Sequence, residues 1–314
     1  MKTIKAARIR DFGGPGAVHV ESTSLDDPGP GSVLVRVHAA GVNPIDWKVR
    51  SGALKEKLAP RLPFTLGGDF SGVVEALNAD VTTFKVGDAV YGQASVLTAG
   101  SGSFAEFVLA RTSHIAAKPR SVSHEIAGAL PLAGVSAVQA LTEHLRVSKG
   151  QRILIHGGAG GIGGFAIQLA RHLGAQVATT VSADDIEYAK RLGANQVIDR
   201  KKQKFEEVVR NLDAVLDTVG GDTYVRSFRV LKEQGRLVSL LEAPREDLAK
   251  EFQVEAINQF TQVNSQRLAS LARYVDEGAV KVHIDKAFPL ADAAAALQHL
   301  EKESPRGKVI LKLA

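Results

Sequence analysis

Hydrophobic residues follow different patterns in the two parts of this chain. Up to about residue 120, short apolar runs are interrupted by Gly and Pro: SVLVRVHAAGV (32–42), FSGVVEAL (70–77), GDAVYG (87–92) and FAEFVLA (104–110). Short strands with frequent turns are typical of a compact, mostly β, barrel-like domain. We therefore expect residues 1–120 to form such a domain.

From residue 121, apolar strands alternate with amphipathic helices. The predicted strands are 151–157, 175–181, 195–200, 213–220 and 235–241, and the predicted helices are 123–145, 163–174, 183–193, 224–235 and 264–278. Repeated strand–helix pairs with nearly all-apolar strands indicate a parallel sheet covered on both faces. The predicted fold class is α/β, with a doubly wound parallel sheet over residues 121–282.

The C-terminal segment has the short-strand texture of the first region. A helix around 292–303 is followed by the strand GKVILKL (307–313). We expect residues 283–314 to pack back onto residues 1–120. The α/β domain, 121–282, would then be an insertion in the β-rich domain.

A glycine motif, G-x-G-x-x-G, closes the first α/β strand and opens a helix. Gly158 suits a tight turn, Gly160 lets the backbone approach a pyrophosphate, and Gly163 allows helix and strand to pack closely. Free N–H groups at the helix start would then face the phosphates. The predicted dinucleotide cradle is Gly158, Ala159, Gly160, Gly161, Ile162 and Gly163.

The end of the second α/β strand bears on which dinucleotide binds. An NAD site usually has an acidic residue there, but this strand ends at Ser182. Ser182 and Arg200, at the next strand tip, are predicted to contact a 2′-phosphate, which favours NADP(H). The alternatives are a helix N-cap for Ser182 and a solvated surface position for Arg200. Asp184 and Asp185 suit the first turn of a helix but would repel the phosphate if turned inward.

Composition narrows the class of protein further. The chain has 314 residues, a net charge of +5 and no cysteine. Its basic residues are scattered among 34 acidic ones, so an anionic cofactor is a better expected partner than nucleic acid. The absence of cysteine fits a reducing cytoplasm, and no apolar run reaches the roughly 18 residues of a membrane span. The start, MKTIKAARIRDF, does not resemble a signal peptide.

Several motifs together resemble the zinc-independent quinone oxidoreductases of the medium-chain dehydrogenase/reductase superfamily. They include AAGVNPIDWKVRSG (39–52), LGGDFSGVV (66–74), VGDAVYG (86–92), LPLAGVSAVQAL (130–141), GGAGGIGGFAIQLAR (157–171), LGANQVID (192–199), DAVLDTVGG (213–221) and GKVILKL (307–313). The resemblance covers nearly the whole chain. It implies a GroES-like β-rich domain, a Rossmann domain, a homodimer, and hydride transfer from NADPH to quinones or α,β-unsaturated carbonyl compounds.

Zinc alcohol dehydrogenases differ from this chain at their metal ligands. They carry a cysteine where this chain has Asn43 and a His-Glu pair where it has Gly68-Asp69. Their second, four-cysteine zinc lobe is impossible in a chain without cysteine. Hydride addition to an electron-poor acceptor needs orientation and a donor for the developing charge rather than a metal. We therefore expect no metal, and a small electrophilic substrate.

The resemblance also assigns roles to individual residues. Asn43 would lie beside the nicotinamide ribose, Asp46 at the inner end of the same turn, and Trp47 in the wall of the substrate slot. The alternatives are a turn initiator, a helix cap and a core side chain, respectively. The further cofactor contacts expected are Ser136, Val219, Gly220, Leu240, Leu241 and Lys308; buried strand residues and, for Lys308, a solvated lysine are the alternatives.

Two other functions compete with this one. A cofactor-binding scaffold of the same fold, without catalysis, is compatible with the same motifs. An NAD(P)-linked alcohol dehydrogenase is disfavoured by the missing zinc ligands. A Gly/Ser-rich segment, SVLTAGSGSFAEF (95–107), is expected to form a mobile rim of the substrate pocket.

Overall fold

The computed structural model describes residues 1–58, 61–95 and 101–313. These residues form two compact units. Unit 1 comprises 1–132, 263–276 and 282–314, and unit 2 comprises 133–262 and 277–281. Residues 96–100, within the expected rim segment, lie outside the described residues.

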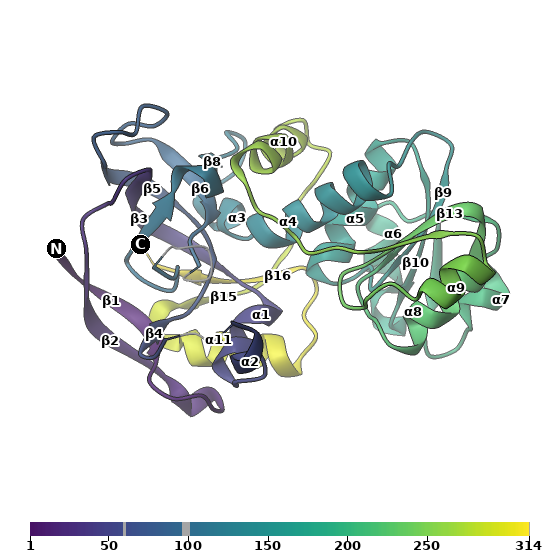
Figure 1. Cartoon of the computed structure of the whole chain (residues 1–314), viewed down its shortest axis with the longest axis horizontal. Coiled ribbons are helices and arrows are strands. Elements are labelled where there is room, and N and C mark those ends of the chain that lie inside the picture. Colours follow the sequence, from purple (N-terminus) through teal and green to yellow (C-terminus); the bar gives the residue numbers. More distant parts are fainter. Residues whose placement is uncertain (59–60, 96–100, 314) are drawn as a thin grey trace. The chain divides into compact units, whose positions relative to one another are not determined.

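Unit 1 is built on two β-sheets (Figure 1). The three-stranded sheet has the order β2-β1-β4; its strands are β1 (Lys2–Ile9), β2 (Val18–Leu25) and β4 (Phe64–Thr65). The larger sheet has the order β15-β16-β3-β5-β6-β8, and β7 also pairs with β3. Its strands are β3 (Ser32–Val42), β5 (Asp69–Leu77), β6 (Ala89–Gln93), β7 (Phe107–Arg111), β8 (Ile115–Ala117), β15 (Ile284–Pro289) and β16 (Lys308–Lys312). The C-terminal β16 is antiparallel to β3, so the tail completes the β-rich unit.

The α-helices that accompany these sheets in the described part of unit 1 are α1 (Pro44–Arg50), α2 (Lys55–Leu58), α3 (His124–Gly128), α10 (Ser265–Asp276) and α11 (Ala293–Lys302). The core between sheets and helices includes Val35, Phe70 and Leu297, all fully buried. Helix α11 contacts α1, and the Arg50 guanidinium at the end of α1 pairs with Glu301 on α11 at 2.9 Å. This packing positions the start of α1, where Asn43 lies.

Unit 2 contains a six-stranded sheet in the order β11-β10-β9-β12-β13-β14, with every neighbouring pair parallel. The strands are β9 (Arg152–His156), β10 (Gln176–Val181), β11 (Gln196–Asp199), β12 (Leu212–Asp217), β13 (Leu231–Ser239) and β14 (Glu255–Asn258). Its helices are α5 (Gly161–His172), α6 (Ile186–Arg191), α7 (Phe205–Val208), α8 (Asp222–Ser227) and α9 (Glu246–Glu251). The chain order reverses beside β9, which is where doubly wound sheets bind ligands. The predicted α/β fold is confirmed.

Two predicted helices differ from the structure. The segment 123–145 is not one helix: α3 ends before Pro131, where α4 (Pro131–Val138) begins, and a π-helix (Gln139–His144) follows. Proline supplies no N–H and disfavours helix in the residue before it, which explains the break. The helix expected over 224–235 ends early, because Val230 and Leu231 are buried in the sheet core and β13 begins at Leu231.

Helix α10 belongs to unit 1, whereas the sequence placed it in the α/β domain. Its buried residues are Leu268, Leu271 and Val275. The Tyr91 hydroxyl on β6 donates to the Leu268 carbonyl at 2.6 Å. The Arg120 N–H and the Ser121 hydroxyl donate to Asp276, so both ends of α10 are tied to the β-rich unit.

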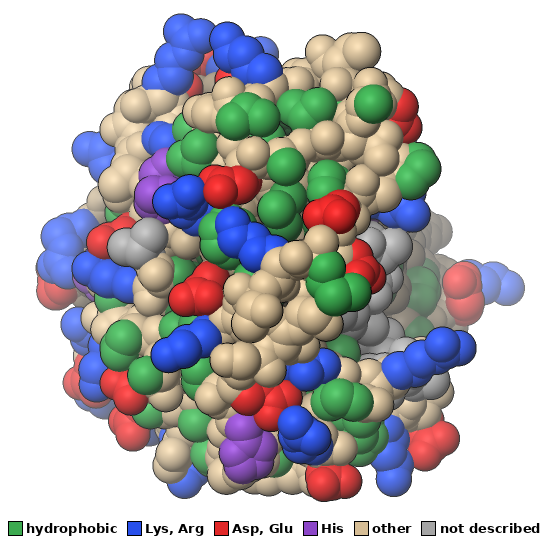
Figure 2. Space-filling model, turned by 90° about the vertical axis from the view of Figure 1, so that its left-hand side faces the viewer, with side chains coloured by type: hydrophobic (Ala, Val, Ile, Leu, Met, Phe, Trp, Pro, Cys, Tyr) green, Lys and Arg blue, Asp and Glu red, His purple; other side chains and the backbone are tan. Residues whose placement is uncertain are grey.

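Charged side chains of both signs are mixed on the surface. Figure 2 shows one face on which Lys and Arg lie among Asp and Glu. Several of the basic groups are paired, as in Arg8–Glu21 and Arg36–Glu75. Among the described residues, no helix combines the length and hydropathy needed to cross a membrane.

Candidate functional site

Unit 1 contains a buried polar cluster around Asn43, which we call the Asn43 network: Asn43, Asp46, Asp69 and Lys308. Asn43 lies between β3 and α1, Asp69 begins β5, and Lys308 begins β16. Adjacent strands of one sheet therefore bring together residues that are up to 265 positions apart. All four side chains are buried.

The side-chain amide of Asn43 has one fixed orientation. Its Nδ2 donates to Asp69 Oδ2 at 2.8 Å, and its Oδ1 accepts from Lys308 Nζ at 2.5 Å. Reversing the amide would set a donor against an ammonium group and an acceptor against a carboxylate. The network thus holds the Asn43 side chain in a defined position at the start of α1.

Asp46 interacts with the same residue through the backbone. Its Oδ2 accepts a hydrogen bond from the Asn43 N–H at 2.7 Å. This is the return half of a capping box, in which a side chain at the third helical position satisfies the N-cap N–H. The alternative that Asp46 itself caps a helix is therefore wrong about the N-cap, which is Asn43: Asp46 lies at the third helical position and bonds back to the N-cap N–H. A direct role of Asp46 in the reaction stays a prediction.

Asp69 accepts further hydrogen bonds. The Leu132 N–H donates to Oδ2 at 2.9 Å, and Gln93 Nε2 lies 3.4 Å from Oδ1. The sequence reasoning considered Asp69 only as a poor metal ligand and missed Gln93. An acidic residue at the start of a mostly apolar strand, DFSGVVEAL, was the available indication that this carboxyl is buried with partners.

Burial perturbs the three ionisable groups of the network. It raises the pKa of Asp46 to about 7, with the nearby Asp69 charge adding to the effect and the Asn43 N–H opposing it. Burial also raises the pKa of Asp69 and lowers that of Lys308. Two carboxyl groups face one ammonium group, so the network is neutral only when it keeps one carboxyl proton.

Lys308 and Trp47 lie in more buried surroundings than their predicted roles imply. Lys308 was expected to reach a cofactor phosphate or solvent, but its Nζ is buried and bound to Asn43 Oδ1, with Val42 O at 3.4 Å. Solvation of Lys308 is thus wrong, since only 4% of the residue is exposed. Trp47 is partly buried and packs against the unit 1 core, and its role in a substrate slot stays a prediction.

The glycine motif of unit 2 forms the turn between β9 and α5. The left-handed backbone falls at Gly157 (φ 73°) rather than at Gly158. A Cβ on Gly158 would lie 2.1 Å from Thr179 Oγ1, and one on Gly163 would lie 2.2 Å from Gly157 O. A Cβ on Gly160 would meet only Gly157 O, at 3.4 Å. Gly158 and Gly163 are therefore required by packing, whereas Gly160 borders open space where a ligand can approach.

The tips of β10 and β11 lie together, as the prediction of a 2′-phosphate contact requires. The Arg200 N–H donates to the Val181 carbonyl at 2.9 Å, and the Arg200 residue is exposed. The Ser182 hydroxyl donates to Asp185 Oδ2. Asp185 therefore turns toward Ser182, so a 2′-phosphate would compete with this carboxylate for the hydroxyl.

Two buried side chains shape the turns after β12 and β13. Asp217 Oδ1 accepts from the Val219 and Gly220 N–H groups at 2.9 and 3.0 Å. The Ser239 hydroxyl donates to Asp217 Oδ2 at 2.8 Å and accepts from the Leu241 N–H. Val219 and Leu241 are 48% and 52% exposed, so the structure does not place them in buried strand. Leu240 is half-buried and Gly220 is buried. Sequence reasoning missed Asp217 and Ser239.

Ser136 is held from the end of β14. Its hydroxyl lies 2.8 Å from Thr261 Oγ1, and its carbonyl accepts from Gln259 Nε2 at 3.0 Å. Ser136 is buried in unit 2. These contacts fix the backbone of the GVSAVQAL segment, and the predicted contact of this backbone with nicotinamide stays a prediction.

Two protein-family models match the chain. The model described as "Alcohol dehydrogenase GroES-like domain" matches residues 29–120, and the model described as "Zinc-binding dehydrogenase" matches residues 192–311. The first match confirms the GroES-like character of the β-rich region. The chain has no cysteine. Within the part of the chain that the structure describes, no three His, Cys, Asp or Glu side chains are grouped as metal ligands.

Similar proteins extend the match over the whole chain. The solved structure of the quinone oxidoreductase from Coxiella burnetii shares 36% identity, covers 100% of both chains and has a TM-score of 0.92. The 2-methylene-furan-3-one reductase of Solanum lycopersicum is 34% identical over 98% of this chain and 79% of its own length. The Escherichia coli quinone oxidoreductase complexed with NADPH shares 26% identity over 98% of this chain and 99% of that one, with a TM-score of 0.87.

Proposed function

Because the chain belongs to the quinone oxidoreductase family of the medium-chain dehydrogenase/reductase superfamily, we propose that it reduces quinones or α,β-unsaturated carbonyl compounds with NADPH, without a metal. Its class is that of an NAD(P)H-dependent oxidoreductase. The preference for NADPH and the choice of acceptor are the finer parts of the proposal.

The glycine turn between β9 and α5 is the observation that carries this proposal. Gly160 leaves open space beside the first N–H groups of α5. Backbone N–H groups at a helix N-terminus bind phosphates well, because their partial charges are unsatisfied. The residues that would hold the pyrophosphate are Gly158 to Gly163, with Ser182 and Arg200 for the 2′-phosphate. When bound, NADPH supplies the hydride.

The chain's own residues supply orientation. Asp217 and Ser239 fix the turns that present Val219 and Leu241, two exposed apolar side chains at the carboxyl ends of their strands. Apolar side chains at this edge exclude water from a nicotinamide ring. In unit 1, the Asn43 network holds one amide in a defined direction. Groups fixed before the reaction need no reorganisation during it.

A turnover assay tests the proposal. Protein and NADPH are mixed with 1,4-benzoquinones or with short 2-alkenals, and the loss of the reduced-nicotinamide absorbance is followed. Acceptor-dependent loss supports the proposal. Binding of NADPH without turnover over a broad acceptor panel contradicts it and favours the non-catalytic scaffold, whereas chelator-sensitive alcohol oxidation favours the dehydrogenase.

The homodimer implied by the resemblance is a separate proposal. Sedimentation velocity measures it directly: a single species of twice the 33.3 kDa chain mass is expected. A concentration-independent monomer would contradict it.

A further inference from the structure

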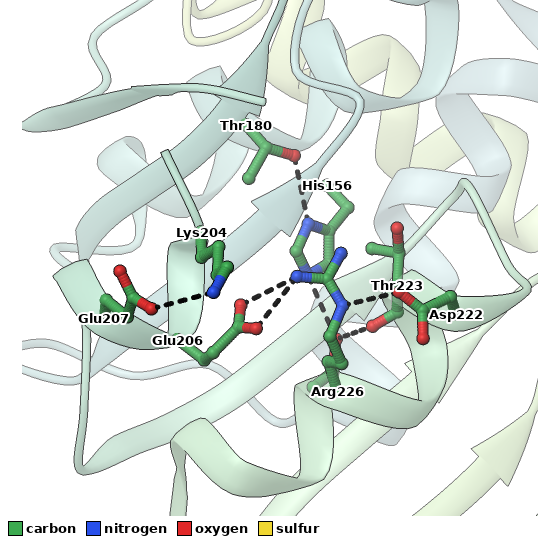
Figure 3. Close-up of polar contacts among 9 residues, drawn as sticks. His156, Thr180, Lys204, Glu206, Glu207, Asp222, Thr223 and Arg226 are labelled. Carbon is green, nitrogen blue, oxygen red and sulfur yellow. Dashed lines mark hydrogen bonds and ion pairs between the residues drawn. The ribbon is translucent and has the colours of Figure 1, made fainter. Parts of the chain in front are cut away.

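His156 is the last residue of β9 and directly precedes the left-handed Gly157. Its ring is fully buried in unit 2. Nδ1 lies 3.0 Å from Thr180 Oγ1 on β10, and Nε2 lies 3.0 Å from Ser227 Oγ at the end of α8 (Figure 3). We call His156, Thr180 and Ser227 the His156 network.

Hydrogen-bond counting fixes the tautomer of this ring. A serine hydroxyl has one proton, and Ser227 donates it to the Thr223 carbonyl at 2.7 Å. Ser227 Oγ can therefore only accept from His156, so the ring proton is on Nε2. Nδ1 is then an acceptor, and the Thr180 hydroxyl donates to it.

The ring stays neutral at any working pH. Burial lowers the pKa of His156 to about 3; the positive charge of Arg226 adds to this effect, and Glu206 opposes it. The Arg226 guanidinium is held by both oxygens of Glu206 at 2.9 Å (Figure 3). It also lies over the Phe205 ring, which makes a T-shaped contact with the His156 ring. The arrangement of donors and acceptors is therefore constant over the pH range in which the ring stays neutral.

The His156 network connects to the glycine turn through two backbone contacts. The Thr180 carbonyl accepts from the Gly158 N–H at 3.2 Å, and the His156 carbonyl accepts from Thr218 Oγ1 at 2.8 Å. The imidazole thus links β9, which leads into the turn, to β10, whose Thr180 carbonyl holds the Gly158 N–H of the turn. A shift of the ring would therefore displace both His156 and Thr180, and with Thr180 the hydrogen bond to Gly158.

We propose that His156 is a positioning residue: as a neutral ring protonated on Nε2, it sets the β9–α5 turn in the conformation that receives a pyrophosphate. This inference rests on the proposed function and deepens it. His156 touches neither cofactor nor acceptor, and it acts through Thr180 and Gly158. If His156 positions the β9–α5 turn, its loss should weaken only the ligands whose pyrophosphate binds at that turn.

The test compares ligands with and without a pyrophosphate. Affinities of NADPH, NADH, 2′-AMP and adenosine are measured by calorimetry for the wild type and for His156→Leu. Loss of the buried hydrogen bonds is expected to weaken both dinucleotides roughly tenfold or more, with 2′-AMP and adenosine, which have no 5′-phosphate, unchanged. Equal losses for all four ligands, or no loss for any, would overturn the proposal. A wild type that binds neither dinucleotide would overturn the proposed function itself, and this inference with it.

Smaller variants keep the test valid if His156→Leu does not fold. Thr180→Val removes the donor to Nδ1 and is expected to weaken the dinucleotides in the same selective way, whereas Thr180→Ser keeps the hydroxyl and restores affinity. His172→Leu, on the exposed end of α5, is the matched control and should bind all four ligands as the wild type does. Unselective effects of Thr180→Val, or failure of Thr180→Ser to restore binding, would contradict the role.

Discussion

Unit 1 buries two carboxyl groups and an ammonium group around Asn43, whereas unit 2 buries a neutral imidazole between two hydroxyl groups beside the glycine turn. Both clusters hold a loop next to a strand end. They differ in what holds them: the Asn43 network depends on charge balance, and the His156 network depends on a fixed tautomer. Buried charges are costly unless they are paired, so the first cluster depends on how many of its carboxyl groups are ionised.

The two networks contribute to stability with opposite dependence on pH. The pKa of Asp46 rises to about 7 on folding, so its contribution is complete below the unfolded value near 4 and is lost as pH rises to about 7. The pKa of His156 falls to about 3, so its contribution is complete above the unfolded value near 6.5 and is lost on acidification. Unit 1 is thus weakened by alkali and unit 2 by acid.

Removal of the cation should have the largest effect. Lys308→Met leaves two buried carboxyl groups without their ammonium partner and is expected to lower the free energy of unfolding by about 3–5 kcal/mol. The loss should be greatest near pH 8 and smaller near pH 5, where the Asp46 carboxyl, with its pKa raised to about 7, is protonated. Urea denaturation at both pH values measures it.

Lys312→Met is the matched control for this variant. It lies on the same strand with its side chain 48% exposed and paired with Glu125, so a loss below about 1 kcal/mol is expected. Equal destabilisation by Lys308→Met at both pH values would show that charge balance does not hold the network.

The glycine turn provides the next test, because it depends on shape rather than charge. Gly160 has φ −75° and ψ 174°, which alanine adopts without strain. Gly160→Ala should leave stability unchanged and weaken NADPH about 100-fold, or nearly 3 kcal/mol, because the added methyl group fills the space for the pyrophosphate. Calorimetry and thermal denaturation measure the two effects.

Gly164→Ala is the control for this substitution on the same helix. Its added Cβ would lie 3.4 Å from Leu192 Cδ1 and 3.7 Å from the Gly158 carbonyl oxygen, which are ordinary van der Waals contacts, so it displaces nothing in the turn. Normal NADPH affinity is expected for it. If Gly160→Ala bound NADPH like the wild type, the cradle would lie elsewhere.

The strand tips test which dinucleotide is preferred. Arg200→Ala should weaken NADPH by about 1–3 kcal/mol if the guanidinium meets a 2′-phosphate, and leave NADH nearly unaltered. Asp185→Asn should shift preference the other way, toward NADPH, because it removes a negative charge from Ser182. Arg191→Ala, exposed at the end of α6, controls for loss of general positive charge. Equal losses of both cofactors in Arg200→Ala would remove the phosphate assignment.

The smallest expected effect concerns Asp46. Asp46→Asn keeps an acceptor for the Asn43 N–H but cannot ionise, so it should gain about 1–2 kcal/mol over the wild type near pH 8 and nothing near pH 4. Denaturation across this range measures the difference. A constant difference at all pH values would mean that Asp46 does not titrate with a raised pKa.

Local sequence patterns were sufficient to predict most of the fold and the glycine turn. The spacing of Gly158, Gly160 and Gly163 after an apolar strand is a local property, and the structure has the expected strand–turn–helix there. The helix break before Pro131 could also have been predicted from the local sequence, but the long apolar run around it favoured one continuous helix over 123–145. The early start of β13 was not readable, since it depends on burial of Leu231 by distant strands.

The two polar networks could not be predicted from local sequence patterns. Lys308 meets Asn43 across 265 residues, and His156 meets Ser227 across 71. Lysine and histidine occur most often at solvated or isolated positions, so only the sheet order shows which partners they have. The sequence identified Asn43, Asp46 and Lys308 separately but not as one cluster.

A calorimetric titration of the folded wild-type chain with NADPH and with NADH tests the proposed dinucleotide site. We expect one dinucleotide site per chain, with tighter binding of NADPH. Absence of binding of either nucleotide by protein with a cooperative unfolding transition would contradict it.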